Sequence, residues 1–371
     1  MKYARLGATG LTVSRITLGT MTFGLQTDEE TSRVILDRAV DAGVTLLDTA
    51  DVYPLGGGLE TAGRTEEIVG RWLRGKRQRV LVATKAVGRV GAAAWDQGSS
   101  RKHILDAIEG SLRRLGTDYV DLYQLHSDDE TTPLDETLEA LDSVVRSGKA
   151  RYVGVSNFLA YRLARAIGRT EARRLARIVS VQPRYNLLFR EVERELLPLA
   201  IEEGVGVIPY NPLAGGLLTG KHRKGTAPTT GTRFTLGTAA ERYQDRYWHE
   251  REFDTVEKVR AVATSAGLSV TTTSVAWVLS HRNRPARSTC TRPGFRPHPA
   301  AAGCGWVKEE HRTLGGRRGP AAERRGHREQ SRRGRRVIVR EGASDRAGAR
   351  RACGDRGNRC GEVRRRDRRA G

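Results

Sequence analysis

Cysteine is absent from residues 1–280, and the four cysteines of the 371-residue chain all lie further along, at Cys290, Cys304, Cys353 and Cys360. Residues 1–280 therefore have no disulfide framework and no cysteine ligands, and we predict no metal site there. No apolar run approaches the roughly 18–20 residues needed to cross a bilayer. The first residues, MKYARLGATGLTVSR, also lack the apolar core of a signal peptide. These absences predict a cytoplasmic protein without a membrane partner.

Acidic residues are scarce in only one part of the chain. Residues 1–280 contain 38 Lys and Arg against 34 Asp and Glu, whereas residues 281–371 contain 27 against 9. In this second part Arg, Gly, Ala and Pro account for 56 of 91 positions. Such a composition buries too little apolar surface to offset the entropy lost on ordering. We therefore predict a folded domain over 1–280 and an arginine-rich tail over 281–371.

Three interpretations of this tail are open. Its arginines could bind nucleic acid, although only Phe295 and Trp306 supply aromatic rings between them. It could instead be a disordered extension. It could also come from a GC-rich coding sequence read in the wrong frame, which yields arginine, glycine, alanine and proline. Because the composition changes within a few residues of His281, we favour the frameshift and give nucleic-acid binding the least weight.

Residues 1–280 alternate short β-rich runs with longer helical stretches. Seven β-rich runs cover 15–24, 44–53, 79–88, 120–126, 150–157, 178–186 and 205–212. Seven such units at a spacing of roughly 30 residues predict parallel strands with crossover helices. Either a doubly wound sheet or a (β/α)8 barrel would fit, and the absence of a G-x-G-x-x-G fingerprint in LGTMTFG favours the barrel. Before the first unit, Gly7 to Gly10 predict the turn of an N-terminal β-hairpin that could plug the barrel floor.

Polar side chains able to do chemistry or to bind a ligand stand at the ends of these runs. In a (β/α)8 barrel the strand ends gather at the C-terminal face, where active sites lie. These residues are Asp48, Tyr53, Lys85, His126, Ser156, Asn157, Gln182 and Tyr210. Each one alone has an ordinary structural explanation. Asp48 and Lys85 both directly follow apolar runs, however, and unpaired charges there would be costly unless the two neutralise each other.

The motifs GVTLLDTADVY, VATK, YQLH, VGVSN, VQPRYN and VIPYNPLAGGLLTGK, in this order and spacing, resemble the aldo-keto reductase family. The resemblance covers roughly residues 3–280 and is strongest to the bacterial broad-specificity branch, which is also similar to potassium-channel β subunits. It implies an NADP-dependent oxidoreductase that reduces aldehyde or ketone carbonyls of small molecules to alcohols, with NADPH as cofactor and NAD as an alternative. The rival hypotheses are a non-catalytic barrel that binds cofactor and senses redox state, and nucleic-acid association through the tail.

The resemblance also implies roles for the residues that carry it. Tyr53 would donate a proton to the carbonyl oxygen, and His126 would orient that oxygen. A free tyrosine has a pKa of about 10, and the Lys85 ammonium, held by Asp48, is expected to lower it. The cofactor would contact three groups: Ser156, Asn157 and Gln182 at the nicotinamide carboxamide, Tyr210 against the nicotinamide ring, and backbone amides of Pro212, Leu213, Gly215, Gly216 and Leu217 along the pyrophosphate.

Two further expectations concern the substrate and the barrel's last unit. The carbonyl pocket would be walled by Met21, Phe23 and the region of Trp95, which suggests an apolar or aromatic aldehyde or ketone. After VAWVLSH the family pattern continues with an eighth strand and a G-x-R run that grips the 2′-phosphate of the cofactor. Residues 281–371 contain no such run after an apolar strand. We therefore expect a barrel that lacks a proper eighth strand.

Overall fold

The computed structural model describes residues 1–280; the predictions for the tail and for the eighth strand fall on 281–371 and lie outside the described residues. The chain begins with a hairpin in which β1 (Tyr3–Arg5) pairs antiparallel with β2 (Thr12–Ser14). At the turn, Gly7 has a φ of 57°, and an added Cβ would lie 2.4 Å from the carbonyl oxygen of Gly204. Only glycine fits this left-handed and crowded position. The predicted N-terminal hairpin is confirmed.

Seven parallel strands form one sheet in the chain order β3-β4-β5-β6-β7-β8-β9. Their bounds are β3 Leu18–Gly19, β4 Leu46–Asp48, β5 Leu81–Ala86, β6 Val120–Leu125, β7 Ala150–Ser156, β8 Ile178–Gln182 and β9 Gly206–Val207. Each predicted β-rich run contains one of them. This curled parallel sheet with crossover helices has the fold of a (β/α)8 barrel, which confirms the predicted fold class.

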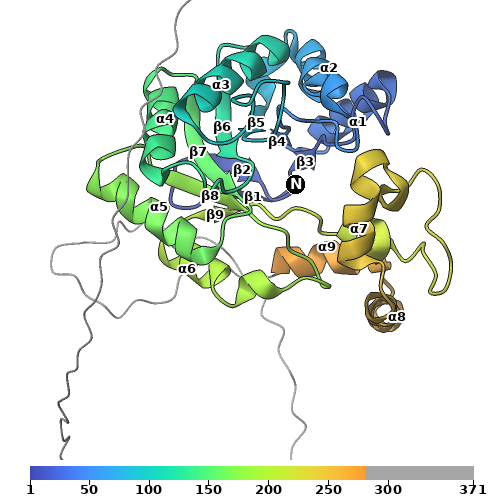
Figure 1. The fold of residues 1–371 in the computed structure, drawn as a ribbon. Coiled ribbons are helices and arrows are strands. Elements are labelled where there is room, and N and C mark those ends of the chain that lie inside the picture. The colour runs from blue at the N-terminus through green and yellow to red at the C-terminus, as the bar shows by residue number, and fades with distance from the viewer. Residues whose placement is uncertain (281–371) are drawn as a thin grey trace, which may run out of the picture. The chain divides into compact units, whose positions relative to one another are not determined.

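Six helices connect consecutive strands and lie around the outside of the sheet (Figure 1). They are α1 Glu29–Asp41, α2 Arg64–Leu73, α3 Arg101–Leu115, α4 Leu134–Arg146, α5 Ala160–Ala172 and α6 Leu196–Glu202. Local sequence sets their ends: Ser100 caps α3 by accepting from the N–H of His103, and Gly116 ends it in the left-handed conformation. After β9 follow α7 (Ala240–Tyr247), α8 (Glu250–Ser265) and α9 (Val270–Ser280).

The alternation of side chains along each strand produces two cores. Outward residues such as Leu47, Val82 and Val153 pack against the helices in the main core. The inward residues Leu46, Ala83, Leu122 and Val179 form a separate inner cluster, which Leu6 and Val13 of the hairpin complete. The hairpin therefore plugs the barrel floor and leaves the opposite end of the strands to polar side chains.

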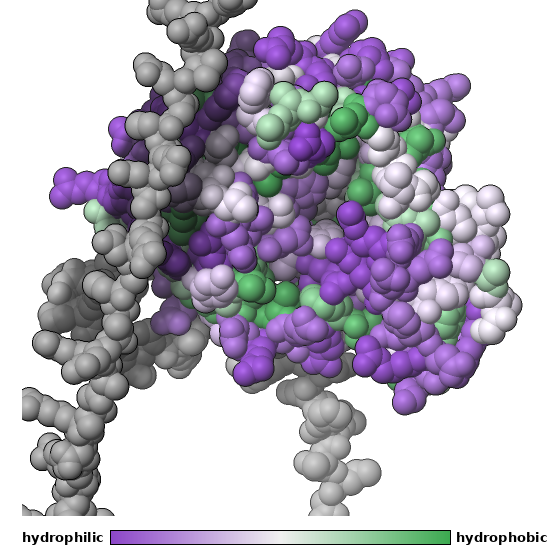
Figure 2. All heavy atoms as spheres, viewed as in Figure 1, coloured by the Kyte–Doolittle hydropathy of each residue, from purple (hydrophilic) through white to green (hydrophobic). Residues whose placement is uncertain are grey.

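On the face drawn in Figure 2, hydrophilic residues predominate and hydrophobic ones gather in small groups. None of the described helices is by itself long and apolar enough to cross a membrane. Within residues 1–280, one bent pair, α8 and α9 at 93°, reaches the required length and composition when taken together.

Candidate active site

A buried ion pair lies at the centre of the C-terminal end of the barrel. Asp48 is the last residue of β4, and Lys85 lies near the end of the neighbouring strand β5. Lys85 Nζ donates to Asp48 Oδ2 at 2.6 Å and to the carbonyl oxygen of Thr49 at 2.8 Å. The side chain of Lys85 is fully buried, and Asp48 is 8% exposed. The two charges that the sequence places after apolar runs thus neutralise each other inside the barrel.

Tyr53 lies above this pair, on the loop that follows β4. It is 7% exposed, and Lys85 Nζ lies 5.1 Å from the centroid of its ring. Its carbonyl oxygen accepts from the backbone N–H groups of Gly63 and Thr65, at 3.1 and 3.3 Å. The start of α2 therefore fixes the loop that carries the phenol.

His126 completes the group from the third neighbouring strand. It directly follows β6, and its backbone N–H donates to the carbonyl oxygen of Ala86 at 2.8 Å. The rings of His126 and Tyr53 meet edge to face, with centroids 5.6 Å apart and an interplanar angle of 79°. The structure thus brings together all four residues to which the resemblance gives a catalytic role.

Burial and charge set the protonation of these groups. Burial raises the pKa of Tyr53 and the Asp48 carboxylate adds to this, whereas Lys85 lowers it, so that the pKa lies above its ordinary value. The expected lowering by Lys85 is present, but desolvation of the phenolate outweighs it. Burial lowers the pKa of Lys85, but Asp48 and Tyr53 raise it by more, and the net shift is upward. Burial, with help from the charges of Lys85 and Arg242, lowers the pKa of His126 to about 3. At neutral pH Tyr53 holds its proton, Lys85 is charged and His126 is neutral.

Two glutamines hold Asp48, and our sequence analysis missed one of them. Gln182 Nε2 donates to Asp48 Oδ1 at 3.0 Å, and Gln124 Nε2 approaches the same oxygen at 3.4 Å. Gln124 lies in the middle of β6, so a search of strand ends does not find it. The period of two was the available signal, because Leu122 and Gln124 of β6 and His126 directly after it lie at alternate positions that share the inward direction.

The residues expected at the nicotinamide carboxamide lie on neighbouring strand ends. Ser156 Oγ donates to the carbonyl oxygen of Gln182 at 2.8 Å, and Asn157 Nδ2 donates to the carbonyl oxygen of His126 at 2.9 Å. Tyr210 Oη donates to Asn157 Oδ1 at 2.7 Å. Asn157 adopts a left-handed φ of 57°, which turns its amide toward this group. Asn157 Nδ2 also donates to Ser156 Oγ at 3.1 Å. The side chains of Ser156, Asn157 and Tyr210 are thus connected, and they reach Gln182 through its backbone carbonyl, while the Gln182 side chain binds Asp48.

The segment after Tyr210, expected to line the pyrophosphate, is a tight turn with three successive residues in the left-handed conformation. Ala214, Gly215 and Gly216 have φ values of 48°, 70° and 110°. The N–H of Ala214 donates to the carbonyl oxygen of Asn211 at 2.9 Å and that of Gly216 to the carbonyl oxygen of Leu213 at 2.8 Å, so the turn itself engages these two amides, including the Gly216 donor expected at the pyrophosphate. A Cβ on Gly215 would lie 2.7 Å from the ring of Tyr243, so the glycine also lets α7 pack closely. Leu213 and Leu217 belong to the same loop, but Pro212 has no N–H and cannot donate. Together with the carboxamide cluster, this loop fits a nicotinamide dinucleotide.

The residues expected to wall the carbonyl pocket differ in accessibility. Phe23 is 2% exposed and packs within the main core, where it offers no face to a ligand. Met21 is half-buried, and Trp95 is 58% exposed. Of the three, Met21 and Trp95 therefore have surface available to a substrate.

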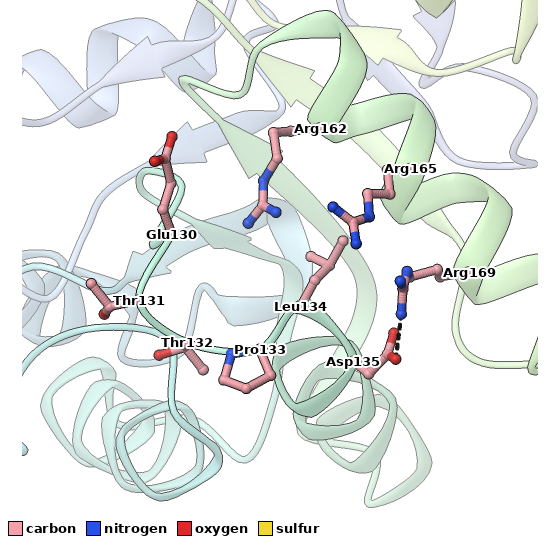
Figure 3. Close-up of a pocket in the computed structure, with 9 residues that line it drawn as sticks. All are labelled: Glu130, Thr131, Thr132, Pro133, Leu134, Asp135, Arg162, Arg165 and Arg169. Carbon is pink, nitrogen blue, oxygen red and sulfur yellow. Dashed lines mark hydrogen bonds and ion pairs between the residues drawn. The ribbon is translucent and has the colours of Figure 1, made fainter. Parts of the chain in front are cut away.

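The rim beyond His126 is braced by arginines of α5. Arg162 binds Asp128 through two hydrogen bonds, of 2.6 and 2.8 Å. Figure 3 shows Arg162, Arg165 and Arg169 directed toward the 130–135 segment, where Arg169 pairs with Asp135. These contacts hold the loop that leads out of the site.

A second group of charged residues lies between α2 and β5, on the side of β5 that faces the helices. Glu66 of α2 is fully buried; it accepts from Thr84 Oγ1 at 2.5 Å and from Arg114 Nε at 2.8 Å. Asp51 is also buried, and neither of its carboxyl oxygens has a hydrogen-bond partner among the described residues. Burial first, and then the charge of Glu66, raise the pKa of Asp51 well above its ordinary value. No group of three or more His, Cys, Asp or Glu within residues 1–280 is arranged to hold a metal ion.

Comparison with known proteins agrees with this geometry. The model of the Aldo/keto reductase family matches residues 15–296. The chain is 40% identical over 288 residues to an uncharacterized oxidoreductase, YrpG, of Bacillus subtilis (strain 168), covering 76% of this chain and 84% of that protein. It is 38% identical to a probable voltage-gated potassium channel subunit beta of Oryza sativa subsp. japonica (76% and 85%) and 33% identical to the versiconal hemiacetal acetate reductase of Aspergillus parasiticus (76% and 86%).

This chain belongs to the aldo/keto reductase family, in the branch that includes bacterial oxidoreductases and the potassium-channel β subunits. It is accordingly an oxidoreductase of the carbonyl-reducing class. The family generally uses NAD(P)H and acts on small-molecule carbonyl substrates.

Proposed function

We propose that this protein is an NADPH-dependent carbonyl reductase in which Tyr53 donates the proton. The observation that carries the proposal is the arrangement of Lys85, which is fully buried, paired with Asp48 at 2.6 Å and 5.1 Å from the ring centroid of Tyr53. A buried cation beside a phenol stabilises the phenolate that proton donation leaves behind. His126, whose pKa is about 3, is neutral and cannot be the acid at neutral pH.

The chain's own residues would act in one concerted proton transfer. The cofactor, when bound, supplies the hydride that reaches the carbonyl carbon. The O–H bond of Tyr53 breaks as its proton passes to the carbonyl oxygen, and the product is an alcohol. The phenolate remains beside the Lys85 ammonium until a proton returns from solvent. His126 donates a hydrogen bond to the carbonyl oxygen and thereby orients it.

The same cluster supports the choice of cofactor. Ser156, Asn157 and Gln182 would hold the carboxamide, Tyr210 would stack on the nicotinamide ring, and the 212–217 loop would take the pyrophosphate. The preference for NADPH over NADH rests on the family resemblance. Measured KM values for the two cofactors test it, with the lower value expected for NADPH.

The rival hypothesis, a barrel that binds cofactor only to sense redox state, leaves the four catalytic positions without a purpose. Steady-state turnover of a generic aldehyde separates the two hypotheses, because a sensor would bind NADPH without sustained oxidation. We expect turnover, with apolar or aromatic aldehydes preferred since Met21 and Trp95 offer surface at the mouth.

The decisive test is Tyr53→Phe, which removes the proton donor and keeps the ring. We expect kcat/KM to fall by more than tenfold, a cost above about 1.4 kcal/mol, while NADPH binding measured by fluorescence quenching stays nearly intact. Tyr119→Phe is the matched control, because this tyrosine lies at the opposite end of the barrel, before β6. If Tyr53→Phe keeps more than a tenth of the parent kcat/KM, Tyr53 is not the proton donor.

A further inference from the structure

A buried histidine lies shortly after the 212–217 loop. His222 is 4% exposed, and its Nε2 is buried without a hydrogen-bond partner among the described residues. Two aromatic rings meet it edge to face: the ring centroid of Phe234 lies 5.1 Å away and that of Trp248 lies 5.0 Å away. These two rings also contact each other, with centroids 4.6 Å apart. The imidazole therefore packs as an apolar ring between aromatic side chains.

The ring of Phe234 connects this histidine to the loop. A Cβ added to Gly215 would lie 3.4 Å from Phe234 Cζ, so the backbone of the loop lies directly against that ring. Leu217 and Leu218 belong to the same buried hydrophobic cluster as Phe234. One side of Phe234 thus supports the loop expected at the pyrophosphate, and His222 packs against the same ring.

The segment that carries Phe234 is held in place from two other directions. Gln244 Nε2 of α7 donates to the carbonyl oxygen of Phe234 at 2.7 Å. Further along the segment, the N–H of Thr238 donates to the carbonyl oxygen of Gly56 at 3.3 Å, and a Cβ on Gly237 would lie 2.1 Å from that oxygen. Because α7 and the loop after Tyr53 both fix this segment, the position of the histidine depends on how well its own ring fits beside Phe234.

No counter-charge is placed to receive a proton on His222. Burial first, and then the charge of Lys221, lower the pKa of His222. Within residues 1–280 no carboxylate forms an ion pair with the imidazole, and Arg223 and His249 are exposed to solvent. The other charged groups on the segments around it have partners of their own: Lys224 with Glu250 and Asp254, Arg251 with Glu252, Arg260 with Glu257, and Arg233 with Tyr243.

A proton on this imidazole therefore has a defined structural consequence. A charge between apolar rings without a partner is costly, and the cost is avoided when the side chain moves into water. The packed position favours neutral His222, and acid favours the released position. Since the loop and the histidine share the ring of Phe234, release of one loosens the support of the other.

We propose that neutral His222 is a positioning residue for the 212–217 loop, and that its protonation loosens the loop and weakens cofactor binding. This inference rests on the proposed function, which places the cofactor pyrophosphate at that loop. His222 acts through Phe234 and the loop, so it differs from the residues that would touch the cofactor itself.

The test compares the full-length parent with His222→Phe, which keeps a ring beside Phe234 and Trp248 but cannot take up a proton. The Kd for NADP+, the acid-stable form of the cofactor, is measured by fluorescence quenching at about pH 7.5 and about pH 5.5. Acid is expected to raise the Kd of the parent by up to about tenfold more than that of the variant, the limit for a group with a pKa of about 6.5 in water. The 2′-phosphate of the cofactor also titrates in this range, but it does so with both proteins and cancels in the comparison.

Two further variants complete the comparison. His249→Gln is the matched control, because His249 is an exposed histidine next to Trp248, and this variant is expected to keep the pH dependence of the parent. His222→Tyr supplies a second ring without a titrating imidazole and replaces His222→Phe if the latter does not fold. The inference is overturned if the uncharged-ring variant and the parent lose affinity by the same factor in acid, since His222 then only fills space.

Failure of the proposed function gives a different result. If the parent does not bind NADP+ at either pH, the cofactor assignment fails, and the role of His222 is then measured without cofactor from acrylamide quenching of tryptophan fluorescence. Trp248 reports on the histidine because the two rings are in contact. Stronger quenching in acid for the parent but not for His222→Phe supports release of the histidine, and equal quenching of the two proteins at both pH values refutes it.

Discussion

Asp51 offers the sharpest test of the electrostatics behind the site. Its backbone N–H donates to the carbonyl oxygen of Lys85 at 3.0 Å, while both carboxyl oxygens lack a hydrogen-bond partner in the described part of the chain. Glu66 and Tyr123 lie near it, and Arg114 and Lys85 are the cations that act on it. Arg114 pairs with Glu66 at 2.7 Å and Lys85 with Asp48. Because neither cation is free to pair with Asp51, its carboxyl keeps a proton that an exposed aspartate would lose.

This proton makes stability depend on pH in a defined direction. In the unfolded chain Asp51 has a pKa of about 3.9, and burial raises its pKa well above that in the folded protein. Between the two pKa values the folded state binds more protons, so the free energy of unfolding falls as pH rises. The contribution of this one group is about 1.4 kcal/mol for each pH unit, until the folded pKa is reached.

Asp51→Asn replaces the protonated acid with a neutral group of the same shape and removes this dependence. We expect the stability of the variant relative to the parent to increase as pH rises from 5, by about 1.4 kcal/mol for each pH unit that lies below the folded pKa of Asp51. Urea unfolding curves at pH 5, 6 and 7 measure the difference. Asp118→Asn is the matched control, because Asp118 is exposed, and its difference from the parent should not change with pH. A constant or shrinking advantage for Asp51→Asn would show that Asp51 is ionised in the folded protein and refute the reasoning.

Two further predictions concern the catalytic lysine and the end of the chain. Lys85→Met removes the cation that lowers the pKa of Tyr53, so the pH profile of reduction should move upward as the rate falls; the double variant with Asp48→Asn avoids the cost of an unpaired buried charge, about 3–5 kcal/mol. An unchanged pH profile in a folded variant would rule out the proposed coupling. For the tail, a one-base shift near codon 281 is expected to restore an apolar strand and a G-x-R run. Within residues 1–280, β3 and β9 each pair on one side only, so the chain as written should unfold at a lower temperature than a version with the restored frame and bind NADPH more weakly. Cooperative unfolding with NADPH quenching at micromolar concentration, and no restoring frame, would contradict the frameshift.

The strand ends show how far sequence reasoning reached into the site. Asp48, Lys85, His126, Ser156 and Gln182 were found because each stands where an apolar run ends, and parallel strands bring such ends to one edge. The structure gathers all of them there. Gln124 was missed because it lies inside a strand and not at its end. The inward register of β6 brings its amide to Asp48.

Phe23 and Asp51 are two residues whose surroundings the sequence did not predict. Phe23 was expected to wall the carbonyl pocket together with Met21 and Trp95, yet it packs into the main core. Asp51 lies in the same motif as Asp48 and Tyr53, and nothing in DTADVY distinguishes a paired carboxylate from an unpaired one. The distinction depends on Glu66 and Arg114, which come from α2 and α3 and meet the loop only in the folded protein.

The sequence by itself determined the alternation of strands and helices, the parallel sheet, the hairpin and most of the polar residues at the mouth, because these follow from local periodicity and from the rule that strand ends share an edge. Only the tertiary structure decided which charges are paired, how deeply each is buried and therefore which groups hold a proton. The net rise in the pKa of Tyr53 is the clearest case, since the sequence predicts the lysine that lowers it but not the desolvation that outweighs that lysine. Desolvation sums over every atom packed around a group, and most of those atoms come from segments distant in the chain.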